Sequence, residues 1–361
     1  MTEEERLYMH WFCFLAKMPY RKKRELLWMH FSPKRMFHME KKECLKYFRE
    51  SELEPFWNSR NLDRAKWEME WLKKHHGWTV FWNEEHYPSK LKEIPDYPLG
   101  LYGKGRLPRE ETLSIAMVGA RDATPYGIQA AEYFARELAS IDIQIISGLA
   151  RGIDGHSHKA ALTTGYTLGV LGCGLDTQYP RSNGYLYDQM EEKGGILTEY
   201  PIGTKPLSIH FPSRNRIISG LSDGIFVIEA RKRSGSLITV DLALDQGREI
   251  FALSGRYYDT LSSGCMDLIQ KGAKLVYTPE DILEEFGILR KNLVKNISNK
   301  KISLAKKEKL VYDCLRLEPR HIDEIVNECQ MPVSEVLSIL TVLEMKHCIR
   351  QTDKNCYRMN D

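Results

Sequence analysis

The stretch Ile115-Ala116-Met117-Val118-Gly119-Ala120-Arg121 sets the pattern for the middle of the chain, because an apolar run leads directly into a glycine turn. Helical patterns such as 126–140 separate this run from further apolar runs of the same kind. Those runs lie at 143–146, 167–171, 224–228 and 249–253. Strands that alternate with helices form parallel sheets covered on both faces. The sequence therefore predicts an α/β domain built on a mostly parallel sheet.

Glycine and tryptophan divide the chain into parts of different character. Of the 25 glycines, 24 fall between residues 100 and 287, whereas all seven tryptophans lie between Trp11 and Trp82. Glycine permits the tight turns that join strands to helices, so we place the sheet in 76–287 and expect mostly helical flanks. Within that region, 76–110 is aromatic and rich in proline, and we expect it to be a connector packed onto the sheet.

The N-terminal segment, 1–75, carries a helical pattern. Its apolar residues recur at helical spacing, as in Leu7, Trp11 and Leu15, which predicts an all-α domain. A run of four basic residues, 21–24, either contacts phosphates or forms the solvated start of a helix.

The C-terminal part begins with a charged segment. Segment 288–309 holds eight Lys and Arg residues against one acid, Glu308, and is predicted to be a basic linker. Segment 310–361 then has the pattern of three helices followed by a two-stranded hairpin with its turn at 353–355. That order is typical of a winged-helix domain, which is related to helix-turn-helix modules.

The overall composition is that of a globular protein, with 361 residues, 42% of them hydrophobic and 28% charged. The 52 basic and 49 acidic residues give a formal charge of +3, which neither implies nor excludes a nucleic-acid partner. No stretch approaches the ~18 apolar residues of a membrane-spanning helix, and no signal peptide is expected. The eight cysteines form no C-x-x-C pair, which predicts reduced thiols, a cytoplasmic protein and no zinc site.

Glycine turns follow four of the predicted strands. They contain Gly119 with Arg121, Ser147 with Gly148, the run Gly172-Cys173-Gly174, and the run from Arg231 to Ser236. The carboxyl ends of parallel strands share one edge of a sheet, and ligands bind there. Backbone N–H groups, helix N-termini and arginine side chains all attract anions at such an edge. The sequence therefore predicts a rim that suits several phosphates.

The turns do not carry a standard nucleotide fingerprint. The G-x-G-x-x-G motif is absent after the first strand, where Arg121 would obstruct the usual path of a dinucleotide pyrophosphate, and no P-loop motif is present. A second basic segment joins Phe211 to Arg214 and Arg216. It offers a stacking surface and guanidinium forks for phosphates, and the open alternative is a helix start held by arginine–carboxylate pairs.

With these residues in view, the chain resembles the DprA family, also called Smf, the bacterial DNA-processing proteins of natural transformation. The likeness covers about 75–280 closely, and 310–361 look like the winged-helix domain that many members carry. The matching motifs are Val118–Arg121, Tyr126-Gly127, Ser147–Asp154 with His158 and Ala161-Leu162, Leu171–Asp176, Tyr179-Pro180 with Asn183, Glu199–Pro201, Phe211–Ile218, Glu229-Ala230, Ser234–Thr239, Gly264, Leu268-Ile269 and Gly272-Ala273. The resemblance implies an extended Rossmann-like domain, with a SAM-like helical domain before it and a winged helix after it.

The resemblance also implies a function. Members bind single-stranded DNA without sequence preference, protect it, form homodimers and load RecA, with no catalysis, cofactor or metal. From the rim and the resemblance together, the candidate DNA-binding residues are Gly119, Arg121, Ser147, Gly148, Phe211, Arg214, Asn215, Arg216, Ser234, Gly235 and Ser236. Additional candidate contacts are Lys205, Arg231 and Arg233.

The chain departs from the family pattern in several places. Met18-Pro19-Tyr20-Arg21 stands where members often carry a glycine motif of helix-hairpin-helix type, so we expect 1–75 to pack or contact a partner rather than bind DNA. Ser208 stands where some members have a lysine, which removes or shifts one phosphate contact. Ser254 and Met266 replace a proline and an asparagine, and we expect them to reshape a loop at the pocket edge.

A nucleotide-binding or nucleotide-hydrolysing enzyme on a Rossmann-like fold is the main alternative. It requires a carboxylate or a nucleophile over the rim, and Asp154, Asp176 and Glu229 are the candidates. We expect Asp154 to cap a helix and Asp176 to order a turn instead. Ser236 lies beside glycine but in no G-x-S-x-G elbow, so we expect it to be the N-cap of the following helix.

Two further patterns bear on function. His156 and His158 are two residues apart and do not share a helix face, so packing or capping is expected for His158 rather than metal ligation. A transcription regulator would read duplex DNA with the predicted third helix of the winged-helix domain. That helix, near 333–343, has no Arg or Lys and carries Glu335, whereas base reading needs donors. Its apolar residues favour a protein-contact or regulatory role.

Overall fold

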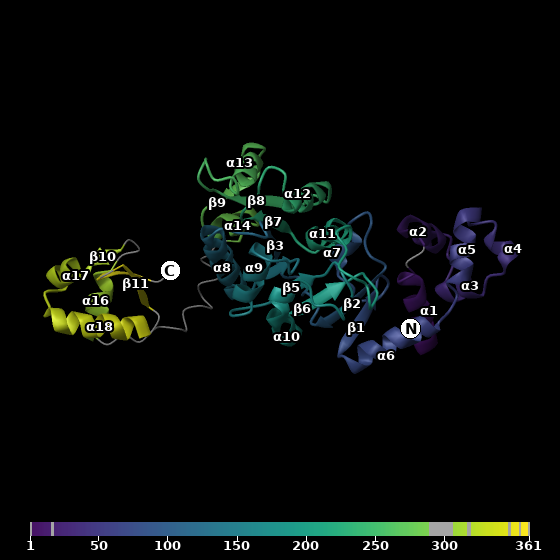
Figure 1. The fold of residues 1–361 in the computed structure, drawn as a ribbon, viewed down its shortest axis with the longest axis horizontal. Helices are drawn as coiled ribbons and strands as arrows, with labels where there is room; N and C mark the ends of the chain where they lie inside the picture. Colours follow the sequence, from purple (N-terminus) through teal and green to yellow (C-terminus); the bar gives the residue numbers. More distant parts are fainter. Residues whose placement is uncertain are drawn as a thin grey trace. The chain divides into compact units, whose positions relative to one another are not determined.

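The structure is a computed structural model that describes residues 2–15, 18–288, 306–315, 319–345, 348–353 and 355–359. Its contacts divide the chain into two units, 1–290 and 291–361, and each is described by itself (Figure 1). The finer domain boundary at residue 75 stays a prediction. Most of the predicted linker, 288–309, lies outside the described residues, as does Lys354 of the predicted turn.

Six helices lie among the described residues at the start of the first unit, which confirms the predicted helical character of 1–75. They are α1 (Glu3–Cys13), α2 (Tyr20–Trp28), α3 (Pro33–His38), α4 (Lys41–Cys44), α5 (Glu50–Asn58) and α6 (Asp63–Lys74). The first helix starts at a capping box, in which Thr2 and Glu5 bond each other's backbone N–H groups. The apolar faces of these helices bury Phe12, Leu26 and Met36 completely.

One sheet of nine strands follows. The strands are β1 (Gly77–Phe81), β2 (Gly100–Gly105), β3 (Ser114–Val118), β4 (Gln144–Ser147), β5 (Thr167–Val170), β6 (Gly195–Thr198), β7 (Gly224–Val227), β8 (Glu249–Leu253) and β9 (Lys274–Val276). Their spatial order is β1-β2-β6-β5-β4-β3-β7-β8-β9. All neighbours from β6 to β9 are parallel, whereas β2 is antiparallel to both β1 and β6. The mostly parallel sheet is confirmed, and 76–110 proves to contribute two of its strands.

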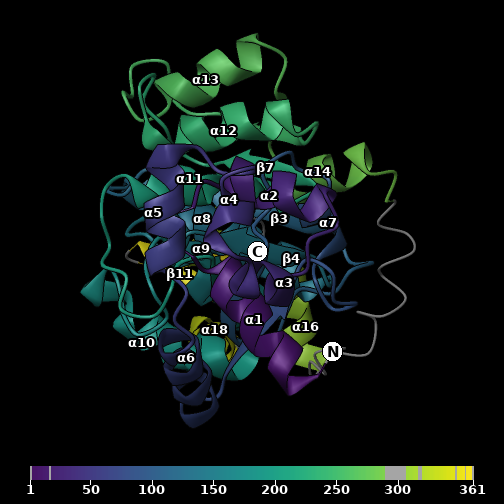
Figure 2. The ribbon, with the colours of Figure 1, turned by 90° about the vertical axis from the view of Figure 1, so that its right-hand side faces the viewer.

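Helices connect the strands and cover the sheet. They are α7 (Ser89–Lys92), α8 (Pro125–Ser140), α9 (Ile153–Ala161), the 3₁₀ turn η1 (Arg181–Asn183), α10 (Gly184–Lys193), α11 (His210–Gly220), α12 (Gly235–Asp245), α13 (Ser263–Gln270) and α14 (Pro279–Glu285). α8 packs against α9, and α11 packs against α12. Figures 1 and 2 both show α12 and α13, in green, at the β7–β9 end of the sheet.

The strand order reverses direction at β3. From β3 the chain steps outward through β4 and β5 to β6, then returns across the sheet to β7 and steps outward the other way. Right-handed crossovers that run in opposite directions place their helices on opposite faces of the sheet. The carboxyl ends of β3 and β7 therefore flank a topological switch point, where open α/β sheets bind ligands.

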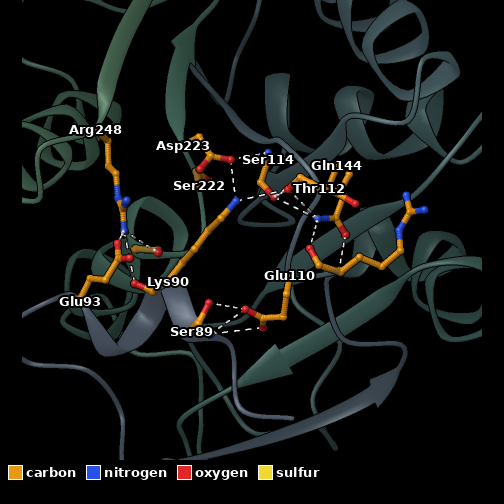
Figure 3. A network of polar contacts seen from close by, with 12 residues as sticks. Ser89, Lys90, Glu93, Glu110, Thr112, Ser114, Gln144, Ser222, Asp223 and Arg248 are labelled. Atoms are coloured by element: carbon orange, nitrogen blue, oxygen red, sulfur yellow. Dashed lines mark hydrogen bonds and ion pairs between the residues drawn. The ribbon is translucent and has the colours of Figure 1, made fainter. Parts of the chain in front are cut away.

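A polar network holds the opposite, amino-terminal edge of the sheet (Figure 3). Lys90 on α7 forms an ion pair with Asp223, at 2.6 Å, and Asp223 also accepts a hydrogen bond from the backbone N–H of Ser114. Nearby, Arg248 pairs with Glu93 at 2.8 Å. These contacts fasten the segment between β1 and β2 to the starts of β3, β7 and β8, so the carboxyl-terminal edge is left for binding.

The second unit has the predicted helix–helix–helix–hairpin order and one additional short strand. Its elements are α16 (Lys306–Asp313), β10 (Arg320–His321), α17 (Ile322–Cys329), α18 (Val333–Met345), β11 (Ile349–Asp353) and β12 (Cys356–Met359). The three strands form a small antiparallel sheet in the order β10-β12-β11. Val311, Ile325 and Leu340 are fully buried in its core.

Two predictions about the chain as a whole can be compared with the described residues. Among the described residues, no disulfide bond joins the cysteines, in line with the expected reduced state. Within the described part of the chain, no helix combines the length and the apolar character that crossing a membrane requires.

Candidate nucleic-acid interface

A pocket of about 590 Å³ opens at the switch point of the sheet. It lies between the turn after β3, the start of α11 and the start of α12. Eight of the eleven predicted DNA-binding residues line it, namely Gly119, Arg121, Phe211, Arg214, Asn215, Ser234, Gly235 and Ser236. The other three, Ser147, Gly148 and Arg216, do not.

Arg121 and Phe211 form the mouth of this pocket. The exposed Arg121 guanidinium lies 5.6 Å from the centre of the Phe211 ring, and no described carboxylate pairs with it. The Tyr179 ring lies 5.5 Å from the same phenylalanine. An exposed cation beside a pair of aromatic rings suits a phosphate and the base attached to it. Tyr179 was missing from the predicted site, although its place after a glycine turn at the same sheet edge was a usable signal.

The N-terminus of α12 forms a second wall. Ser234 is the N-cap, because its hydroxyl accepts a hydrogen bond from the backbone N–H of Ser236. The prediction that Ser236 caps the helix is therefore wrong by two residues. The hydroxyl of Ser236 instead forms a hydrogen bond with the hydroxyl of Ser234 at 2.8 Å. A Cβ on Gly235 would meet no atom within 4 Å, so the pocket is open beside it. The positive end of this helix dipole faces the pocket and favours an anion.

Arg214 lies under the pocket rather than in its mouth. Only 4% of the residue is exposed, and its Nη1 donates to the carbonyls of Gly148, at 2.9 Å, and Val170. Burial lowers the pKa of this guanidinium, and the charge of Asp154 opposes that shift. Arg214 therefore contributes a positive charge from below while it ties α11 to the turn after β4 and to the last residue of β5.

The turn after β4 is closed by its own carboxylate. Asp154, in the first turn of α9, accepts hydrogen bonds from the backbone N–H groups of Gly148 and Ala150. Burial raises the pKa of Asp154, whereas the charge of Arg214 lowers it. The Ser147 hydroxyl points into the sheet and donates to the carbonyl of Met117 at 2.6 Å. Asp154 orders this turn rather than capping a helix, and it occupies the Gly148 amide that was predicted to hold a phosphate.

Arg216 faces away from the pocket. Residues two positions apart on a helix point about 200° apart, so Arg214 and Arg216 lie on different sides of α11. Both terminal nitrogens of Arg216 donate to Glu199 at 2.6 Å, and its Nε lies 3.0 Å from Asp96. Burial alone would lower the pKa of Arg216, but these two carboxylates raise it above its usual value. The expectation that Arg216 lines the same pocket is corrected, and the arginine–carboxylate alternative describes it.

The additional candidates lie outside the pocket lining. Lys205, Arg231 and Arg233 are exposed, and none of them forms an ion pair with a described carboxylate. Ser208 lines the pocket at the position where some family members carry a lysine. The carbonyl of Ser254 accepts a hydrogen bond from the Tyr126 hydroxyl at 2.9 Å. That bond places the loop after β8 beside the turn after β3.

The carboxylates considered as catalytic candidates accept hydrogen bonds from the protein's own turns. Asp176 accepts a hydrogen bond from the N–H of Gly203 at 2.7 Å, which confirms that it orders a turn. Glu229 accepts from the N–H of Thr124 at 2.9 Å and from its hydroxyl, and so holds the turn after β3. His158 is fully buried and bonds Thr167 at 2.7 Å, as expected of a packing residue. His156, on the same helix, bonds Glu132 instead.

A larger cavity, of about 990 Å³, lies elsewhere in the first unit, between the N-terminal helices and the sheet. Its acids are already paired, since Glu68 bonds His10 and Arg64 while Glu199 bonds Arg216. In the smaller pocket, by contrast, the exposed Arg121 has no carboxylate partner among the described residues. Among the described residues, no group of three His, Cys, Asp or Glu side chains could hold a metal ion.

Comparison with known proteins agrees with this architecture. The family model described as DNA recombination-mediator protein A matches residues 78–287, and that of the DprA winged helix domain matches 299–353. The chain belongs to the DprA/Smf family. The winged-helix match confirms the interpretation of the C-terminal unit.

Two curated members of the DprA/Smf family illustrate the likeness. Protein Smf of Escherichia coli (strain K12) is 40% identical over 284 residues, which cover 76% of this chain and 75% of that protein. DNA processing protein DprA of Streptococcus pneumoniae (strain ATCC BAA-255 / R6) is 45% identical over 204 residues, which cover 56% of this chain and 72% of that protein.

Two solved DprA structures are similar as well. DNA processing protein A from Streptococcus pneumoniae matches with a TM-score of 0.66 and 34% identity, over 79% of this chain and 98% of that one. The Helicobacter pylori protein, whose structure describes its single-stranded DNA binding mode, matches with a TM-score of 0.53 and 31% identity. That match covers 58% of this chain and 95% of the other. The predicted family and its Rossmann-like fold are confirmed.

Proposed function

We propose that this chain binds single-stranded DNA without strong sequence preference, with the strand's phosphates in the pocket at the switch point. The carrying observation is the unpaired Arg121 guanidinium beside the Phe211 ring, opposite the N-terminus of α12. A cation and a helix N-terminus attract phosphates of any sequence, and an aromatic ring stacks on any base. The related Helicobacter pylori protein is described as binding single-stranded DNA, which supports the same ligand here.

Binding is the first step of a longer role. We propose that the chain acts in the cytoplasm as a homodimer that protects incoming DNA during natural transformation and loads RecA onto it. The strand β9 supports the dimer, because it ends the sheet and carries the half-exposed Leu275, with exposed Tyr277 just beyond it. An edge strand that exposes apolar side chains is a surface for pairing with another chain. Sedimentation equilibrium measures the dimer, and the rate of RecA assembly on an oligonucleotide, with and without this chain, measures loading.

The decisive test is fluorescence anisotropy with a labelled oligo-dT at several salt concentrations. We expect binding that weakens as salt rises and that unlabelled single strands, but not duplex DNA or free nucleotides, compete away. Replacing Arg121 by Ala should lower affinity and flatten the log–log salt dependence by about 0.7, the contribution of one phosphate on a single strand.

Arg109→Ala is the matched control. Arg109 is exposed too, but it pairs with Asp142 at the opposite edge of the sheet, so its loss should leave the salt dependence unchanged. An Arg121→Ala variant that binds as tightly and with the same slope as the unaltered chain would show that the pocket is wrongly assigned. Competition by a free nucleotide, together with weak oligonucleotide binding, would favour the nucleotide-enzyme alternative.

A further inference from the structure

The loop after β8, residues 254–262, presents two aromatic side chains to solvent. Tyr257 is 90% exposed, more than any other large apolar or aromatic side chain of the described residues, and Tyr258 is 61% exposed. Their rings lie 5.2 Å apart at 85°, so each keeps a face free. Aromatic rings gain free energy when a partner covers their faces, so this exposed pair is available for stacking.

This loop is held beside the pocket. The backbone N–H of Ala230 donates to the carbonyl of Leu261 at 2.6 Å, and the N–H of Gly264 donates to the carbonyl of Ala230 at 2.8 Å. On its other side, the half-exposed Tyr126 donates to Ser254. The loop therefore adjoins both the turn after β3 and the β7–α12 connection, the two segments that carry Arg121 and Ser234.

The same surface carries several cations and, within the loop itself, one acid, Asp259. Arg231, Arg233 and Arg256 are exposed, and none of them forms an ion pair with a described carboxylate. Arg256 donates to the Tyr258 hydroxyl at 3.2 Å, which keeps the guanidinium next to the ring. The acid on the adjacent helix, Asp267, is engaged with Lys271 at 2.8 Å. Cations interleaved with aromatic rings are the composition of single-strand binding surfaces.

We propose that the single strand leaves the pocket past Ser234 and continues over this loop, where Tyr257 and Tyr258 stack on successive unpaired bases. The cations of 231–233 and Arg256 would hold the phosphates between those bases. This inference rests on the proposed function and extends its site, because it gives the pocket an exit surface that includes two tyrosines outside the predicted site. The partner is a run of unpaired bases of any sequence, since every base offers a π face.

The test compares binding of two oligo-dT strands. One of roughly 6 nucleotides should fill the pocket alone, and one of roughly 20 should also reach the loop, because single-strand sites span about 4–16 nucleotides per domain. The variant is Tyr257→Ala with Tyr258→Ala. We expect it to bind the longer strand about tenfold more weakly, or about 1.4 kcal/mol, and the short strand unchanged. The salt dependence should stay the same because the rings carry no charge.

Two controls separate stacking from other effects. Tyr257→Phe with Tyr258→Phe keeps both rings and should keep the affinity for the longer strand. Tyr185→Ala removes a tyrosine of 52% exposure from α10, which packs on the β6 side of the sheet, and should change neither strand's binding. Equal losses in the Phe and Ala variants would overturn the stacking role, since the hydroxyls would then be responsible.

The outcomes distinguish this inference from the proposed function. If the Ala variant binds both lengths like the unaltered chain while Arg121→Ala weakens both, the pocket stands and the exit surface is refuted. If Arg121→Ala changes neither length, the pocket assignment fails, and the inference fails with it because its strand starts there. If the tyrosine-to-alanine variant binds only the longer strand more weakly, and only Arg121→Ala weakens binding of the short strand, the proposed pocket and the exit surface are both supported.

Discussion

The buried His158 makes the stability of the first unit depend on pH in a way that can be calculated. Its Nδ1 bonds the Thr167 hydroxyl, which itself donates to the carbonyl of Ile145, so Nδ1 carries a hydrogen and donates it to Thr167. Burial, together with the charge of Arg214, lowers the pKa of His158 to about 3. Protonation would place a second positive charge beside Arg214, under the floor of the pocket.

The sign of the effect is set by linkage. The folded pKa of about 3 lies below the unfolded value of about 6.5, so the unfolded chain binds the extra proton in between. The stabilisation is complete above pH 6.5 and is lost as the pH falls from there towards 3. Each pH unit in that window costs about 1.4 kcal/mol, so lowering the pH from 7 to 5 should remove about 2 kcal/mol of the free energy of unfolding through this residue.

The assay is urea unfolding at pH 7 and pH 5, followed by tryptophan fluorescence. All seven tryptophans lie between residues 11 and 82, so the signal reports the first unit alone. His158→Asn keeps a hydrogen-bond donor for Thr167. Between pH 7 and pH 5, its free energy of unfolding should fall by about 2 kcal/mol less than that of the unaltered chain. His156→Asn, on the same helix but partly exposed, leaves His158 in place and should retain the full loss. Equal pH dependence in His158→Asn and the unaltered chain would refute the reasoning.

Two further predictions address the residues around the pocket. Glu199→Gln removes the charged acceptor of Arg216 and should lower the free energy of unfolding in urea by about 1.5–3 kcal/mol. The affinity for oligo-dT, measured by anisotropy, should stay unchanged because Arg216 lies outside the pocket. Unchanged stability with a lost affinity for oligo-dT would return Arg216 to the proposed DNA site. Ser208→Lys adds a cation to the pocket lining and should steepen the salt dependence of oligo-dT binding by about 0.7. An unaltered slope would mean that the side chain at 208 does not reach the strand.

The sheet could be predicted only where its strands are apolar. The runs at β3, β4, β5, β7 and β8 are buried on both faces and stand out as hydrophobic stretches. β2 contains Gly100, Gly103 and Gly105, and such a segment has the composition of a loop. Its place is set by pairing with β1 and β6, and Gly103 is needed because a Cβ there would overlap the Trp78 ring. Contacts between residues so far apart leave no local pattern in the sequence.

The candidate site shows the same division between what is local and what is not. The glycine turns follow apolar runs that are visible in the sequence, and together with the family resemblance they placed eight of the eleven candidates around one pocket. The two arginines of α11 could not be told apart, because the sequence did not show that Glu199 and Asp96 would lie on one side of that helix. Likewise, the loop of Tyr257 carries no motif and is identified only by its exposure and its neighbours.

The geometry changes which groups are available to hold phosphates. The sequence favoured backbone N–H groups in the glycine turns, but the amide of Gly148 is taken by Asp154 and that of Thr124 by Glu229. Asp154 puts a negative charge where the Gly148 turn was predicted to hold a phosphate, and each of the two carboxylates fixes the shape of its turn. In the proposed site, phosphates would therefore be left to the Arg121 side chain and the N-terminus of α12, with the buried charge of Arg214 beneath them. Side-chain cations bind through charge rather than through a fitted cradle, so a site of this kind should be strongly sensitive to salt and tolerant of sequence.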